Sequence, residues 1–208
     1  MIDQTTLITY ILIVLGFVFI PGPATLLTVA RAASSGTRVG IATGAGVAVG
    51  DIIHTAMAII GISAIIAASA TLFSLIKYLG ALYLVYLGVR AILEKAPAVP
   101  GTGVIALSAP KAFRQAVLAE VLNPKTALFF LAFLPQFVNP QNGSVLLQLT
   151  VLGTVFVLLG LLSTVVFAIG AGRLGSFLRR NPTVLKWQGK VVGGIYCALG
   201  LRLALQER

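Results

Sequence analysis

Among the residues that can carry a charge or a proton, Asp51, His54, Glu120 and Lys125 lie well inside apolar stretches of this chain. A charged side chain is costly to bury among apolar neighbours, so its presence there favours a functional role. A buried acid can bind and release a proton, and a lysine can bind a carboxylate. We therefore regard Asp51, Glu120 and His54 as candidates for proton coupling. Lys125 is a candidate ligand for an anionic group of a substrate.

Three of these residues also have a purely structural interpretation. Glu120 and Lys125 would neutralise each other as an internal ion pair if a break in the helix between them brought their side chains together. His54 would be a neutral histidine bonded to a backbone carbonyl. Because the chain has one histidine and one cysteine, the usual ligand rules assemble no metal site from it. We expect neither a metal nor a cofactor.

Two proline motifs accompany these residues, and their members are Pro21, Gly22 and Pro23 in one and Asn123, Pro124 and Lys125 in the other. Proline removes a backbone donor and collides with the preceding turn, so each motif predicts a broken helix. Counted inward from Arg31 and Arg114 at about 1.5 Å per residue, both breaks lie near mid-depth of an apolar layer about 30 Å thick. Prolines can merely kink a helix, but a matched pair of breaks favours a substrate site formed by these six residues.

The composition defines the surroundings of these motifs. Of the 208 residues, 58% are hydrophobic and only 10% are charged, against roughly 25% charged in soluble domains. The chain is therefore expected to be an integral membrane protein. Six stretches are long and apolar enough to cross a bilayer, namely 6–30, 39–66, 71–93, 114–138, 145–171 and 187–205. We predict an all-α membrane protein with six transmembrane helices, of which the first and the fourth are broken.

Internal similarity divides these stretches into two groups of three. Pro23, Thr25 and Leu27 recur at one constant offset as Pro124, Thr126 and Leu128, and the stretch 80–90 resembles 193–202. Because each group crosses the membrane three times, the second group must run in the opposite direction, which predicts an inverted repeat. We expect one membrane domain made of repeats 1–94 and 113–208, joined by a proline-rich cytoplasmic linker, 95–112.

Small residues are concentrated in the second apolar stretch, at Gly40, Gly44, Gly46 and Gly50. Glycines on a membrane helix allow a neighbouring helix to approach closely. We predict that these four serve helix packing, either inside the protein or at the contact of a homodimer.

The basic residues indicate the orientation of the chain. Lysines and arginines gather in the connections after the first, third and fifth apolar stretches, and few lie on the other side. The positive-inside rule places those connections in the cytoplasm, so both termini are predicted to be periplasmic. The same ordering explains the net charge of +10 without a nucleic-acid partner.

Several of these motifs resemble the LysE/RhtB family of bacterial amino-acid exporters. The similar stretches are Pro21-Gly22-Pro23, the glycine series with Asp51, 77–84 and the long block 123–137. The resemblance covers nearly the whole chain and implies an inner-membrane protein that exports amino acids or their derivatives, driven by the proton gradient. The chain departs from many relatives at Ala116, where they have glycine, and at Glu120, where they often have an uncharged polar residue.

We therefore expect a secondary active exporter that works by proton antiport, with a small-molecule substrate and the lipid bilayer as its partners. The presence of only two acids within the apolar stretches favours a neutral amino acid over lysine. Its carboxylate would bind near Lys125 and a helix start, and its ammonium would bind freed carbonyls and an acid. Asp51 is our first candidate for the proton carrier. We do not expect an enzyme, because no nucleophile with a base is recognisable; a passive channel and an exporter of inorganic cations are the alternatives.

Overall fold

The computed structural model describes residues 2–19, 22–68, 70–93 and 107–180, together with isolated positions between 187 and 205. Every regular element in these ranges is helical and none is a strand, which confirms the all-α prediction for this part of the chain. Most of the predicted linker 95–112 and most of the predicted crossing 187–205 lie outside the described residues. The arrangement as two inverted three-helix repeats stays a prediction.

The first apolar stretch forms two helices, α1 (Gln4–Phe19) and α2 (Pro23–Ser35), which are bent by 50° relative to each other. Asp3 caps the start of α1, because its carboxylate accepts a hydrogen bond from the backbone N–H of Thr6 at 2.9 Å. Pro23 takes the first position of α2, where the donor that proline lacks is not needed. Pro21 lies outside the described residues.

A second bend of 52° separates α5 (Ala109–Val121) from α6 (Pro124–Leu128). The sequence predicted one broken helix up to residue 138, but α6 widens into a π-helix, η1 (Phe129–Phe133), and then tightens into a 3₁₀-helix, η2 (Leu134–Phe137). Pro135 gives the reason, because it cannot donate to the carbonyl of Leu131 and so ends the α-helical pattern. A further 3₁₀ turn, η3 (Pro140–Asn142), leads to the last long helix.

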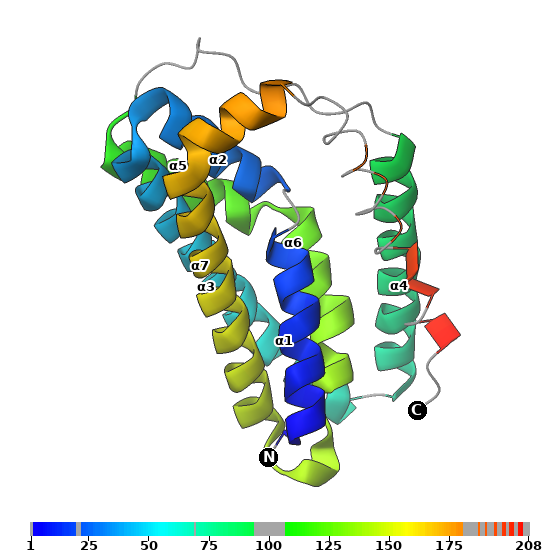
Figure 1. Ribbon diagram of the computed structural model, residues 1–208. Helices are drawn as coiled ribbons and strands as arrows, with labels where there is room; N and C mark the ends of the chain where they lie inside the picture. Colours follow the sequence, from blue (N-terminus) through cyan, green and yellow to red (C-terminus); the bar gives the residue numbers. More distant parts are fainter. Residues whose placement is uncertain are drawn as a thin grey trace.

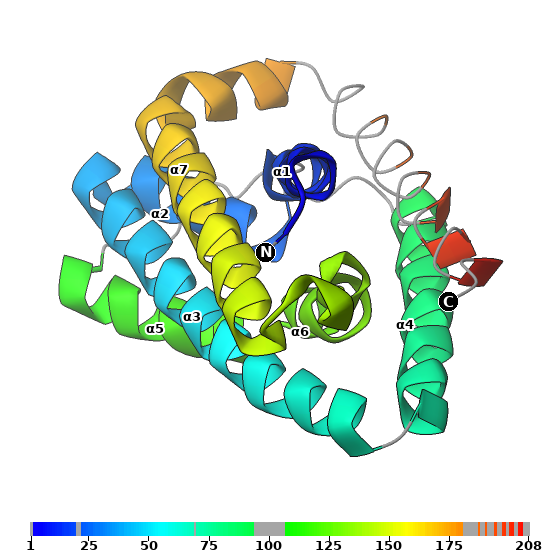
Figure 2. The same cartoon turned by 90° about the horizontal axis from the view of Figure 1, so that it is seen from below.

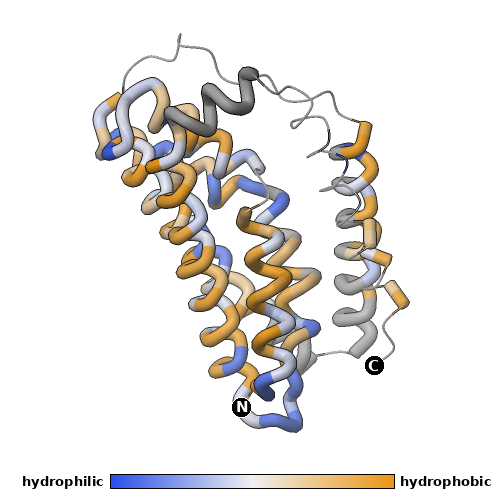
Figure 3. The backbone as a smooth tube through the Cα atoms, in the orientation of Figure 1, coloured by the Kyte–Doolittle hydropathy of each residue, from blue (hydrophilic) through white to orange (hydrophobic). Residues whose placement is uncertain are grey.

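Three longer helices complete the described fold: α3 (Thr37–Ala68), α4 (Ala70–Leu93) and α7 (Val145–Arg180). Helix α3 packs against α2, α5 and α7, whereas α4 stands to the other side of α1 and α6 (Figures 1 and 2). Within the described residues, two helices are apolar and long enough to cross a membrane, or up to four if each bent pair is one crossing. Hydrophobic residues predominate along these helices, and hydrophilic ones gather at the turn near the N-terminus (Figure 3).

The glycines of α3 lie where other helices approach it most closely. A Cβ atom added to Gly50 would lie 2.5 Å from the Cβ of Glu120 on α5, and one added to Gly46 would lie 2.9 Å from that of Ala116. Gly40 faces Ala32 of α2, and Gly44 faces Thr164 of α7. All four glycines therefore contact helices of the same chain.

An aromatic cluster fills the space between α1, η1 and α7. Its largest buried members are Tyr10, Phe17, Phe129, Phe130, Phe133 and Phe156. The rings of Phe17 and Phe129 lie 4.4 Å apart, and the hydroxyl of Tyr10 donates to the carbonyl of Leu152 at 3.0 Å. This cluster packs α1 against the second half of the chain on the N-terminal side of the α1/α2 bend.

Candidate functional site at the two helix breaks

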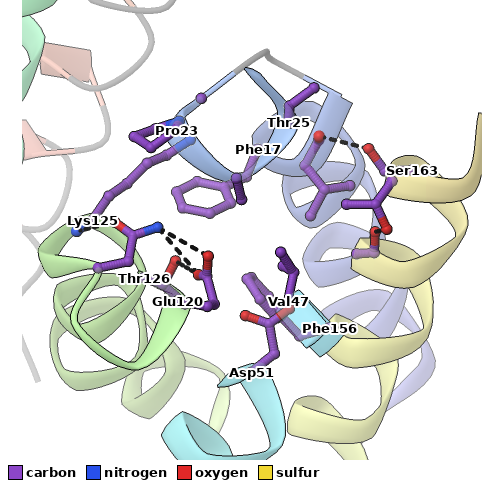
Figure 4. Close-up of a pocket in the computed structure, with 16 residues that line it drawn as sticks. Phe17, Pro23, Thr25, Val47, Asp51, Glu120, Lys125, Thr126, Phe156 and Ser163 are labelled. Atoms are coloured by element: carbon purple, nitrogen blue, oxygen red, sulfur yellow. Dashed lines mark hydrogen bonds between the residues drawn. The ribbon is translucent and has the colours of Figure 1, made fainter. Parts of the chain in front are cut away.

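A cavity of about 430 Å³, its open mouth included, lies where the two broken helices meet. Residues of α1, α2, α3, α5, α6 and α7 line it (Figure 4). Its polar lining consists of Thr25, Asp51, Glu120, Asn123, Lys125, Thr126, Ser163 and Thr164. A cavity lined by apolar side chains with a few directed polar groups is typical of small-molecule sites.

The carboxylate of Glu120 is held by the start of α6. The Asn123 amide donates to its two oxygens at 3.1 and 3.3 Å, and the Thr126 hydroxyl donates at 2.5 Å. Asn123 also caps α6, because its side-chain oxygen accepts from the backbone N–H of Lys125 at 3.0 Å. Asn123 and Thr126 thus hold the carboxylate of Glu120 at the start of α6, where a negative charge is favourable.

The backbone carbonyl of Glu120 is also occupied. Pro124 cannot donate to it, and it accepts instead from the backbone N–H of Asn123 at 2.9 Å and from Nε2 of His54 at 2.8 Å. Nε2 of His54 must therefore carry a hydrogen, since a carbonyl only accepts. His54 is bonded to a backbone carbonyl, which is the structural interpretation of this residue. This carbonyl therefore already accepts two hydrogen bonds, which makes it less available to a substrate ammonium.

A matching contact ends α1. The Ser163 hydroxyl of α7 donates to the carbonyl of Val18 at 2.7 Å (Figure 4). Val18 lies in the last turn of α1, where carbonyls lack partners within the helix. Each broken helix therefore has a carbonyl of its last turn bonded to a side chain from a helix of the other half of the chain.

Asp51 lies on α3 and points into the cavity, with only 3% of its surface exposed (Figure 4). Within the described part of the chain, its carboxyl group makes no hydrogen bond. Its Oδ2 atom faces Gly160 of α7, where an added Cβ would lie 3.2 Å away. A buried acid without a partner is unfavourable for folding, and such groups mark functional sites in membrane proteins.

Lys125 connects the two breaks. Its side chain runs toward Pro23 (Figure 4), and its ammonium lies over the Phe17 ring, 4.2 Å from the centroid. A Cβ added to Gly22 would lie 2.9 Å from Nζ, so the ammonium lies directly against Gly22 and would have to shift to admit a side chain there. Stacking on a ring is worth about 0.5 to 2 kcal/mol. The lysine of one half thus reaches the break of the other half.

The structure places Gly22, Pro23, Asn123, Lys125, Asp51 and Glu120 around one cavity, but not His54, which lies behind Glu120. Pro124 begins α6, and its side chain is outside what the structure describes. Sequence reasoning missed four hydroxyl residues of the lining, Thr25, Thr126, Ser163 and Thr164. The matching positions of Thr25 and Thr126 in the repeat were an available signal. Thr164 had a signal of the same kind, because Thr55 lies at the matching position of the first half, whereas Ser163 is matched by a different residue, His54.

Comparison with known proteins places this chain in a family. A family model described as LysE type translocator matches residues 15–207. The chain belongs to the LysE family of translocators. It is 32% identical to an uncharacterized membrane protein of Vibrio cholerae, over 95% of both chains. It is 34% identical to the uncharacterized membrane protein YrhP of Bacillus subtilis, over 96% of this chain and 99% of the other. No solved structure matches the chain. The LysE family member described here is a membrane transporter.

Proposed function

We propose that this translocator exports amino acids or their derivatives across the bacterial inner membrane in exchange for protons. One observation carries the proposal: a single cavity between the two helix breaks holds an ammonium group on α6 and a carboxyl group on α3 that has no hydrogen-bond partner among the described residues. An amino acid is a small dipolar solute with one charge of each sign. The cavity therefore offers a counter-charge to each end of such a substrate.

The substrate carboxylate binds between Lys125 and the start of α2. Gly22, Pro23, Ala24 and Thr25 line the cavity at that start, and the first turn of a helix leaves backbone donors without partners in the helix. The positive end of the helix dipole and the Lys125 ammonium then act on the same anionic group.

The substrate ammonium binds Asp51. Glu120 is the other acid of the cavity, but Asn123 and Thr126 already donate to its carboxylate. Asp51 has no such partner among the described residues and is the acid that is ready to accept a hydrogen bond. The hydroxyl groups of Thr25 and Thr164 line the same space.

One carboxyl group at position 51 provides a mechanism for exchange. It can hold a proton or a substrate ammonium but not both, so the two occupy the site in turn. A proton that enters from outside displaces the substrate outward, and its release inside prepares the site for the next substrate. A neutral amino acid fits this scheme best, because among the described lining residues Asp51 is the one acid left to pair with it.

The proposal is tested first in cells and then in vesicles. Cells that express the protein are challenged with toxic concentrations of single amino acids and dipeptides, and growth rescue identifies the substrate. Proteoliposomes with an imposed pH gradient then measure whether that substrate moves against its own gradient. Uphill movement supports the proposal, whereas movement only downhill would identify a passive channel. Rescue from inorganic cation salts alone would also overturn it.

Asp51→Asn tests the role of the acid in the same vesicles. We expect loss of substrate-driven proton flux and weaker exchange of labelled for unlabelled substrate, because an amide neither takes up the proton nor offers a counter-charge to the substrate ammonium. Gel filtration in detergent checks that the variant folds. Proton flux equal to that of the wild type would remove Asp51 from the mechanism.

A further inference from the structure

Helices α3 and α7 carry a shared pattern that extends beyond the motifs found at the two breaks. The same step of 109 residues separates Gly44 from Gly153 and Thr55 from Thr164, and it also pairs Ile60 with Ile169 and Gly61 with Gly170. By this step, Asp51 on α3 is matched by Gly160 on α7, and Val47 is matched by Phe156. All four of these last residues line the cavity.

The shared residues make reciprocal contacts. A Cβ added to Gly44 would lie 2.6 Å from the Thr164 hydroxyl, and a Cβ added to Gly153 would collide with Thr55. Thr55 donates to the carbonyl of Asp51 at 2.8 Å, and Thr164 donates to that of Gly160 at 3.1 Å. The step relates Gly44 to Gly153 and Thr55 to Thr164, so the contact of Gly44 with Thr164 is equivalent to the contact of Gly153 with Thr55. The two helices therefore cross in opposite directions about a local two-fold axis.

The same relation extends to the helix breaks. His54 and Ser163 are matched by the step, and each donates to a carbonyl near the end of a broken helix. His54 on α3 donates a hydrogen bond to α5, and Ser163 on α7 donates one to α1. Two independent sets of contacts thus have the same local symmetry.

Positions 51 and 160 face each other across this axis. Asp51 is buried and lacks a hydrogen-bond partner in the described structure, and its Oδ2 atom is directed at Gly160, where only a hydrogen occupies the side-chain position. We propose that positions 51 and 160 are two equivalent attachment points for one carboxyl group, which in this chain is carried by α3. Gly160 is the positioning residue, because it leaves room for the carboxyl group of Asp51. This inference rests on the proposed function, in which that group couples substrate to protons.

The groups around the site would stay in place if the carboxyl group moved from α3 to α7. Glu120 of α5 and Lys125 of α6 line the cavity, Tyr10 of α1 interacts electrostatically with Asp51, and His54 lies one turn further along α3. Helix α7 contributes the hydroxyl groups of Ser163 and Thr164. A carboxyl group attached to position 160 would therefore meet the same neighbours.

Exchanging the two residues tests this directly. We expect Asp51→Gly to lose substrate-driven proton flux in proteoliposomes, and the double variant Asp51→Gly with Gly160→Asp to regain it several-fold. The probe is an equimolar mixture of the common amino acids, and a pH-sensitive dye reports the protons. Gel filtration in detergent shows that each variant is folded.

A second readout does not depend on transport. A hydrophobic carbodiimide modifies protonated carboxyl groups in apolar surroundings, and mass spectrometry of peptides locates the modified residue. We expect modification of Asp51 in the wild type, none on α3 or α7 in Asp51→Gly, and modification at position 160 in the exchanged variant. If modification occurs as expected but no variant moves amino acids, the shared site stands and the proposed function fails. If the double variant is folded but is neither modified at position 160 nor able to couple amino acids to protons, the shared site is overturned. The proposed function still stands in that case if Asp51→Gly loses substrate-driven proton flux.

The role of Gly160 has a milder test in Gly160→Ala. The new methyl group lies 3.2 Å from Oδ2 of Asp51 and should reduce proton flux several-fold, although alanine is the better helix former. Gly170→Ala on the same helix is the matched control, because a Cβ there meets nothing within 4 Å. Equal proton flux in both variants would contradict a positioning role for Gly160.

Discussion

At the scale of single residues, the cavity separates two acids that look alike in the sequence. Glu120 and Asp51 are both buried and both lie beside the breaks. Three hydrogen bonds from Asn123 and Thr126 hold Glu120, whereas the carboxyl group of Asp51 has none within the described residues. We therefore assign the structural role to Glu120 and the exchange of protons to Asp51.

Lys125 leads to a prediction at this scale. Lys125→Ala should weaken amino-acid affinity about tenfold or more, because a hydrogen bond to a charged group is worth about 1.5 to 3 kcal/mol. Binding is measured by the concentration of unlabelled substrate that halves exchange in proteoliposomes. The matched probe is the amide of the same amino acid, which has no carboxylate and should lose little affinity. An equal loss for both compounds would show that Lys125 does not bind the carboxylate.

At the scale of elements, the fold depends on close approach of α3 to α5. Gly46 and Gly50 leave no room for side chains between the two helices, and Glu120 is carried on α5 directly at that contact. The His54 bond to the Glu120 carbonyl is part of the same contact. Packing of these helices thus places the held acid next to the break.

Gly50→Ala should separate the helices. The added methyl group would lie 2.5 Å from the Cβ of Glu120, and overpacking of this kind costs about 1 to 3 kcal/mol. We expect a lower midpoint of thermal unfolding in detergent. Gly61→Ala on the same helix is the control, because its Cβ meets nothing within 4 Å and its helix propensity improves. A midpoint for Gly50→Ala that matches this control would contradict the close contact.

At the scale of the whole molecule, α2 and α5, which contain Arg31, Lys111 and Arg114, lie toward the end opposite to the N-terminus (Figure 1). Arg31 of α2 donates to the side-chain oxygen of Gln115 of α5 at 3.2 Å, which joins the two helices there. We propose that this end faces the cytoplasm and that both termini are periplasmic, with repeats 1–94 and 113–208 running in opposite directions through the membrane.

Cysteine labelling in intact cells tests this orientation. In a Cys197→Ala background, we place single cysteines at Thr37, the first residue of α3, and at Gln141, in the turn before α7; both positions are exposed. A reagent that does not cross the membrane should label position 141 in intact cells and position 37 only after the cells are opened. The reverse pattern would invert the orientation and with it the direction of transport.

Much of the fold was predictable because its causes are local. A lack of charge over long stretches predicts membrane helices, and a proline cannot donate wherever it lies, so bends at Pro23 and Pro124 follow from the adjacent residues. The widening of α6 into η1 was not predicted, although Pro135 was visible, because the form that a helix takes before a proline depends on what packs against it. The aromatic cluster around Phe129 and Phe130 shows that packing.

The sequence by itself therefore determined the membrane class, the positions of the breaks and the small set of buried charged residues. Only the tertiary structure decided which of those groups are already bonded. The partner of the Glu120 carbonyl is His54, and that of the Val18 carbonyl is Ser163, far away along the chain. The glycine opposite Asp51 lies on another helix. Hydrogen bonds and close contacts between helices depend on how the helices cross, and no property of neighbouring residues specifies that geometry.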